Sequence, residues 1–127
     1  MIKTYVAFSA NGDYFLLDLL YVKKIVSGKP DAAGEYALEG DIKILDVTGD
    51  QEEKGNCIIL VRTEGEPVGI RVDDVEELLQ WDEDELLPIP EVIRKQGVNY
   101  STGILVDRKR ERLYIVLDGQ RVEEGAT

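Results

Sequence analysis

The chain has 127 residues, a length that predicts one domain able to bury a sizeable core. Its 26 Asp and Glu outnumber its 15 Lys and Arg, and the resulting net charge of −11 would repel a phosphate backbone, so nucleic acid is not an expected partner. It has no histidine, which excludes a Ser-His-Asp or Cys-His nucleophile and removes the commonest metal ligand.

The single cysteine, Cys57, begins an apolar run that continues through Ile58 to Val61. One cysteine cannot form a disulfide within the chain, so we interpret it as a small core residue in a reducing compartment. Polar residues interrupt the apolar stretches before any reaches the length of a signal sequence or a membrane span. We therefore expect a cytoplasmic protein with no direct membrane insertion.

The first predicted element is a hairpin. Tyr5, Val6 and Phe8 open a strand, Asn11-Gly12 supplies the two residues that adopt positive φ in a tight turn, and residues 14–20 return beside the first strand. Further short strands are expected where apolar runs lie between turn residues, at 22–26, 42–47 and 57–62.

The stretch 67–90 reads as one long strand followed by an acidic turn and two prolines. Val68, Ile70 and Val72 alternate with polar residues, and the doublet Asp73-Asp74 breaks this period, which predicts a bulge that bends the strand. Gly69 predicts the close approach of another backbone or of a partner. The acidic run 82–85 is expected to be a solvated turn, because consecutive carboxylates rarely converge on a cation.

The last part of the chain predicts two strands, 101–106 and 112–117, that flank a charged turn at 107–111. A short helix is possible at 91–96, and the tail 122–127 is expected to fray. Many short strands with regular turns predict an all-β fold, either a barrel or a sandwich, in a single domain over 1–127.

An internal repeat appears when the chain is shifted by 53 residues. Residues 22–26 then fall on 75–79 with the same apolar pattern and inverted charges, and 42–46 separately resembles 114–118. The repeat predicts two small related β-barrel subdomains that share one core and are interleaved, roughly 15–60 and 61–117.

Several segments together resemble the CheW-like family of chemotaxis coupling proteins. They are Tyr5-Val6-Ala7-Phe8 with Asp18, residues 21–26, Val68-Gly69-Ile70-Arg71-Val72-Asp73-Asp74-Val75 with Asp84, Pro88-Ile89-Pro90, Gly103, and Ile115-Val116-Leu117-Asp118. The resemblance implies two SH3-like β-barrel subdomains with no catalytic activity and no cofactor. It also implies an adaptor that links the cytoplasmic tip of a chemoreceptor to a histidine autokinase.

The first functional hypothesis is therefore an adaptor that holds its partner in an apolar groove between the subdomains. Our groove candidates are Val22, Ile25, Gly69 and Val72, for each of which ordinary core packing is the competing interpretation. The family comparison adds Glu39 and Gly40, which stand at the end of a motif where the family usually has arginine followed by glycine. Lys24 likewise replaces a usual glutamate, so both positions reverse the family's charge.

Two other classes of function stay open. A small β-barrel enzyme or ligand carrier would use buried carboxylates such as Asp46, Asp73 and Asp118. Homotypic assembly would pair open strand edges of two copies. Trp81 is interpreted as a core residue, with an aromatic at the mouth of a binding groove as the alternative.

Overall fold

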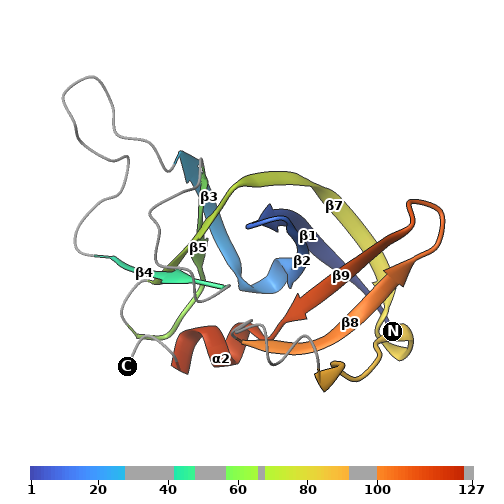
Figure 1. Ribbon diagram of the computed structural model, residues 1–127. Coiled ribbons are helices and arrows are strands. Elements are labelled where there is room, and N and C mark those ends of the chain that lie inside the picture. The colour runs from blue at the N-terminus through green and yellow to red at the C-terminus, as the bar shows by residue number, and fades with distance from the viewer. Residues whose placement is uncertain (28–41, 48–56, 66–67, 92–99, 125–127) are drawn as a thin grey trace.

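The computed structural model describes residues 1–27, 42–47, 57–65, 68–91 and 100–124 (Figure 1). These residues form two β-sheets, as expected for an all-β fold. The five-stranded sheet has the order β7-β1-β2-β9-β8, and the four-stranded sheet has the order β3-β5-β6-β4. The strands are β1 (Ile2–Ala10), β2 (Asp13–Asp18), β3 (Val22–Ser27), β4 (Lys43–Asp46), β5 (Cys57–Val61), β6 (Val68–Val72), β7 (Asp74–Asp82), β8 (Ser101–Asp107) and β9 (Arg112–Leu117).

Short helical elements connect or follow these strands. They are the 3-10 helices η1 (Leu19–Tyr21) and η2 (Glu83–Glu85) and the α-helix α2 (Gly119–Glu124). The predicted hairpin is confirmed: Ala10 lies opposite Asp13, and Asn11 and Gly12 both have positive φ, at 52° and 84°. The predicted strand pair around the charged turn 107–111 is confirmed as β8 and β9.

The expected single long strand from residue 68 onward is in fact two strands in different sheets. β6 ends at Val72 in the four-stranded sheet, and β7 begins at Asp74 in the five-stranded sheet, so the interruption at Asp73 is a crossing rather than a bulge within one ladder. Hydrogen bonds hold the crossing against the first hairpin. The Asp73 N–H donates to the Ser9 carbonyl at 2.8 Å, and the Asn11 N–H donates to Asp73 Oδ2 at 2.7 Å.

The two sheets share their larger core. Side chains from both sheets meet there, among them Phe8 and Phe15 from β1 and β2 and Ile59 and Ile70 from β5 and β6. A smaller core, built on Tyr5, Ala7, Leu16, Leu105, Tyr114 and Val116, lies on the other face of the five-stranded sheet. Alternation within β1 and β2 sends successive side chains to these two cores, which explains why both strands are buried almost throughout.

The repeat is visible in the topology. In the five-stranded sheet, β9 pairs in parallel with β2, the second strand of the antiparallel hairpin β1–β2. In the four-stranded sheet, β4 pairs in parallel with β6, the second strand of the antiparallel hairpin β5–β6. β3 follows the first hairpin along the chain but pairs with β5, the first strand of the second hairpin. Likewise, β7 follows the second hairpin but pairs with β1, the first strand of the first hairpin. The two subdomains thus exchange one strand each, which interleaves them along the chain.

The expectation of a frayed tail is wrong for its first residues. Val122 is fully buried in the shared core, because α2 packs against it. Asp118 caps this helix, since its Oδ1 accepts the N–H of Gln120 at 3.0 Å. The possible short helix at 91–96 falls almost wholly outside the described residues.

Candidate binding surface

Strand β3 lies at an edge of the four-stranded sheet and carries two of the predicted groove residues, Val22 and Ile25. Three positions apart, they would normally face opposite sides of a strand. A register shift between Val22 and Lys24 leaves Lys23 without a partner, so that Val22 lies opposite Val61 and Ile25 opposite Ile59, both residues of the shared core. The bulge therefore brings Val22 and Ile25 to one face.

The exposure of these two residues differs. Val22 is half-buried and packs against the shared core, whereas Ile25 is 41% exposed at its rim. Lys23 and Lys24 between them are exposed, and neither makes an ion pair within the described part of the chain. We call Val22, Lys23, Lys24 and Ile25 the β3 surface. It combines apolar contact area with two available positive charges.

The bulge in β3 has a counterpart in the other subdomain. Phe8 pairs with Val75 and Ala7 with Glu77, which leaves Glu76 as the extra residue of β7. Glu76 is 53 residues after Lys23, the offset of the sequence repeat. The repeat thus extends to the position of the bulge, and the charges at that position are opposite in the two subdomains.

Two predicted groove residues are buried instead. Val72 is 1% exposed and belongs to the shared core. Gly69 is buried in mid-strand, where a Cβ atom would lie 2.8 Å from Ile58 Cγ2 and 3.0 Å from Ile44 Cδ1. Packing therefore explains both residues, since neither offers a surface to a partner. Glu39 and Gly40 lie outside the described residues.

Two of the carboxylates considered for an enzyme hold backbone turns. Asp73 Oδ2 accepts the Asn11 N–H, and Asp118 Oδ1 accepts the N–H groups of Gln120 and Arg121. The side chain of Asp46 is outside the described part of the structure. Among the described residues, no group of three carboxylate or thiol side chains is arranged to hold a metal ion.

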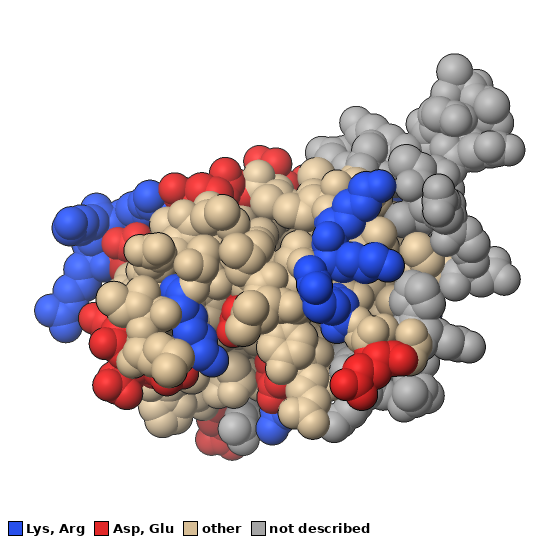
Figure 2. All heavy atoms as spheres, turned by 180° about the vertical axis from the view of Figure 1, so that it is seen from behind, with Lys and Arg blue, Asp and Glu red and all other residues tan. Residues whose placement is uncertain are grey.

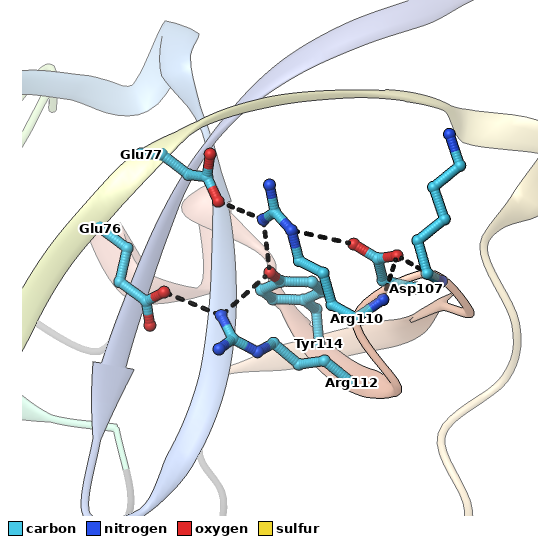
Figure 3. Close-up of polar contacts among 7 residues, drawn as sticks. Glu76, Glu77, Asp107, Arg110, Arg112 and Tyr114 are labelled. Carbon is cyan, nitrogen blue, oxygen red and sulfur yellow. Dashed lines mark hydrogen bonds and ion pairs between the residues drawn. The ribbon is translucent and has the colours of Figure 1, made fainter.

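A polar cluster missed by the sequence analysis joins β7 to the β8–β9 hairpin (Figure 3). Although β1 and β2 lie between β7 and β9 in the sheet, Arg112 Nη1 donates to Glu76 Oε2 at 2.8 Å, and Arg110 forms an ion pair with Glu77. Adjacent residues of a regular strand point to opposite faces of the sheet. The bulge at Glu76 interrupts this alternation, so that Glu76 and Glu77 can both reach the arginines. We call Glu76, Glu77, Arg110 and Arg112 the β7 clasp; it links β7 to the β8–β9 hairpin.

Tyr114 lies at the centre of the β7 clasp. Its ring is fully buried, and its hydroxyl accepts hydrogen bonds from Arg112 at 3.3 Å and Arg110 at 3.4 Å. The bond to Glu77, followed by the bond to Tyr114, raises the pKa of Arg110, and the bond to Tyr114, followed by the bond to Glu76, raises the pKa of Arg112, so both arginines stay charged. Asp107 accepts the N–H groups of Lys109 and Arg110 and so shapes the turn that presents them.

Trp81 packs against the smaller core, in agreement with its interpretation as a core residue. Its indole Nε1 is buried and has no hydrogen-bond acceptor among the described residues.

Basic and acidic side chains are interspersed on the surface. Figure 2 shows Lys and Arg side chains at the edge where the β8–β9 turn projects and on the side of the four-stranded sheet, with Asp and Glu side chains between and beside them. In the described segments, no helix is long and apolar enough to cross a membrane.

Two interleaved β subdomains with a shared core define an all-β domain of two SH3-like subdomains. The CheW-like domain family model matches residues 42–125, and the chain belongs to this family. The crystal structure of the scaffolding protein TtCheW from Thermoanaerobacter tengcongensis has a TM-score of 0.68 and 24% sequence identity, over 93% of this chain and 85% of that chain. This likeness establishes the shared fold. A search of curated proteins found no match.

Proposed function

We propose that the protein is a non-enzymatic scaffold of chemotaxis-type signal transduction, which couples the cytoplasmic tip of a chemoreceptor to a histidine autokinase in the cytoplasm. The observation that carries the proposal is membership of the CheW-like domain family. A scaffolding role is also named for the similar TtCheW structure. Scaffolding needs accessible contact surfaces, and the β3 surface is one such surface.

The β3 surface suits a partner helix or strand for three reasons. It lies at a sheet edge, where backbone groups are open to a further chain. Ile25 offers exposed apolar area beside the half-buried Val22. Lys23 and Lys24 supply positive charge that would favour an acidic partner and select against a basic one.

The test is co-purification with a receptor tip and a histidine autokinase from the source cell, using the purified chain as bait. The wild type should retain both proteins, and Ile25→Glu should lose at least one of them because a charge enters the apolar contact. Leu78→Glu is the matched control, since Leu78 is 58% exposed on the edge strand of the other sheet. Retention of neither protein by the wild type would contradict the scaffold role, and equal losses in the two variants would remove the assignment to β3.

A further inference from the structure

Tyr21 joins two elements that are far apart in the sequence, η1 and α2 (Figure 1). Its ring lies on Gly119, the first residue of α2, and a Cβ atom added to Gly119 would lie 2.5 Å from both Tyr21 Cδ1 and Tyr21 Cδ2. Real Cβ atoms do not approach other heavy atoms this closely, so no side chain fits at position 119 while the ring is in place. Gly119 is buried and its φ lies outside the left-handed region, so lack of space rather than backbone conformation excludes a larger residue.

The backbone around Tyr21 is fixed by hydrogen bonds that do not involve the ring. The Tyr21 carbonyl accepts the N–H of Arg62, which directly follows β5, at 2.7 Å. At the start of η1, Asp18 Oδ1 accepts the N–H of Leu20 at 3.0 Å. η1 ends at Tyr21, and the next residue is Val22, which begins β3 and the β3 surface. A side chain placed at the seat of the ring would therefore displace either α2 or the ring, and with the ring the start of β3.

The seat of the ring depends on the tertiary contacts of α2. This helix has 6 residues, a length at which an isolated helix is not stable in water. Val122 anchors it in the shared core, and Arg121 Nη1 donates a hydrogen bond to the Ser101 carbonyl at 3.1 Å. Tyr21 and Val22 pack against the same shared core. The helix, the ring and the start of β3 thus form one packed unit.

We infer that Tyr21 is a positioning residue for the β3 surface, because its ring, seated on Gly119, couples the docking of α2 to the arrangement of Val22. A partner bound to the β3 surface then stabilises the docked helix, and the docked helix strengthens partner binding by the same factor, since coupling between two sites is reciprocal. The inference rests on the proposed function for its partner. The coupling within the chain needs no partner and is tested separately.

The first experiment measures amide hydrogen exchange of the purified chain under conditions in which every variant is folded. In Gly119→Ala the new methyl group and the ring cannot both keep their places, so exchange at residues 22–26 and at Val122 should quicken together, each at least about fivefold. Gly103→Ala is the matched control, because its Cβ would lie 2.7 Å from Leu86 Cγ, the same kind of clash in β8. Exchange at 22–26 that is unchanged in Gly119→Ala, or equally quickened in the control, would overturn the inference.

A double-mutant cycle tests whether Gly119 acts through the ring. Alanine favours a helix over glycine, so Gly119→Ala should be neutral or stabilising once Tyr21→Ala has removed the ring. In the wild type and in Tyr21→Phe, which keeps the ring, the same substitution should lower the urea midpoint. An equal fall in the Tyr21→Ala background would refute the role of Tyr21. Tyr21→Ala alone creates no clash, so it should also quicken exchange at Val122, and an unchanged rate there would overturn the coupling even if Gly119→Ala did not fold.

Titration against the receptor tip of the source cell measures the effect on binding. Gly119→Ala should bind the tip at least about fivefold more weakly than the wild type, whereas Gly103→Ala should bind like the wild type. Addition of the tip should in turn slow exchange at Val122 in the wild type. Equal affinities of Gly119→Ala and the wild type would overturn the inference. A wild type that does not bind the tip would instead contradict the proposed function, and the exchange experiment would still decide whether Tyr21 couples α2 to β3.

Discussion

The guanidinium carbon of Arg112 lies 3.8 Å from the centroid of the Tyr14 ring, while the same side chain donates a hydrogen bond to Glu76. One arginine thus connects the β7 bulge to an aromatic ring of β2 and to the hydroxyl of Tyr114 on β9. The parallel pairing of Tyr14 with Tyr114 places both rings under this side chain.

Replacing Arg112 should therefore destabilise the packing around the smaller core. Arg112→Gln removes the ion pair and the cation-π contact together, and the urea midpoint should fall relative to the wild type. Arg108→Gln is the control, since Arg108 is exposed and has no ion pair among the described residues, and its midpoint should stay unchanged. Equal midpoints for Arg112→Gln and Arg108→Gln would show that the β7 clasp does not stabilise the fold.

The C-terminal helix should contribute to the shared core through Val122. Val122→Ala removes two methyl groups from a fully buried site and should lower the free energy of unfolding by about 1 to 3 kcal/mol. Gln120→Ala, at an exposed position of the same helix, should change it by less than about 0.5 kcal/mol. Urea unfolding of both variants measures the difference, and a Val122→Ala effect within error would detach α2 from the core.

Gly69 and Gly65 give a matched pair for the close packing of β6. Gly69→Ala places a methyl group 2.8 Å from Ile58 Cγ2 and should cost about 1 to 3 kcal/mol through overpacking. Gly65→Ala meets nothing within 4 Å, so it should be neutral or stabilising by up to about 1 kcal/mol. If denaturant midpoints showed equal effects for the two substitutions, the tight approach at Gly69 would be disproved.

Because of Tyr5, we expect the free energy of unfolding to fall at alkaline pH. Burial raises its pKa above the ordinary value of 10.0, so the phenol ionises more readily in the unfolded chain than in the folded one. Its contribution is fully present below pH 10 and is lost as the pH rises through the folded-state pKa. Lys3, whose pKa is raised by its hydrogen bond to Glu83, acts in the same direction above its ordinary value of 10.5. In urea titrations between pH 9 and 11, Tyr5→Phe should lose less stability than the wild type, and identical slopes would exclude this role for Tyr5.

We expect Glu39 to influence which receptor the protein binds, because the CheW-like resemblance places an arginine at this position. Glu39→Arg should strengthen binding to a generic chemoreceptor tip matched to that arginine, since unpaired or like charges at an interface act mainly on specificity. Titration of both proteins against the tip at low and moderate salt measures the effect. Equal affinities at both salt levels would place position 39 outside the contact.

Local patterns in the sequence determined the positions of most strands and their turns. Asn11-Gly12 predicted its hairpin because few other residue pairs adopt positive φ twice, and the apolar alternation around Val68, Ile70 and Val72 predicted a strand with one buried face. The 53-residue repeat and the segments quoted for the family predicted the two-barrel architecture, which the sheets and the family match confirm.

Long-range pairing was decided only by the tertiary structure. The alternation that predicts a strand does not state its neighbour, so the sequence could not show that Asp73 marks a change of sheet or that β7 pairs with β1. Burial of Val72 and Val122 depends on which surfaces close over them. The β7 clasp likewise depends on a bulge that turns Glu76 and Glu77 toward side chains more than thirty residues away, a proximity that local periodicity does not encode.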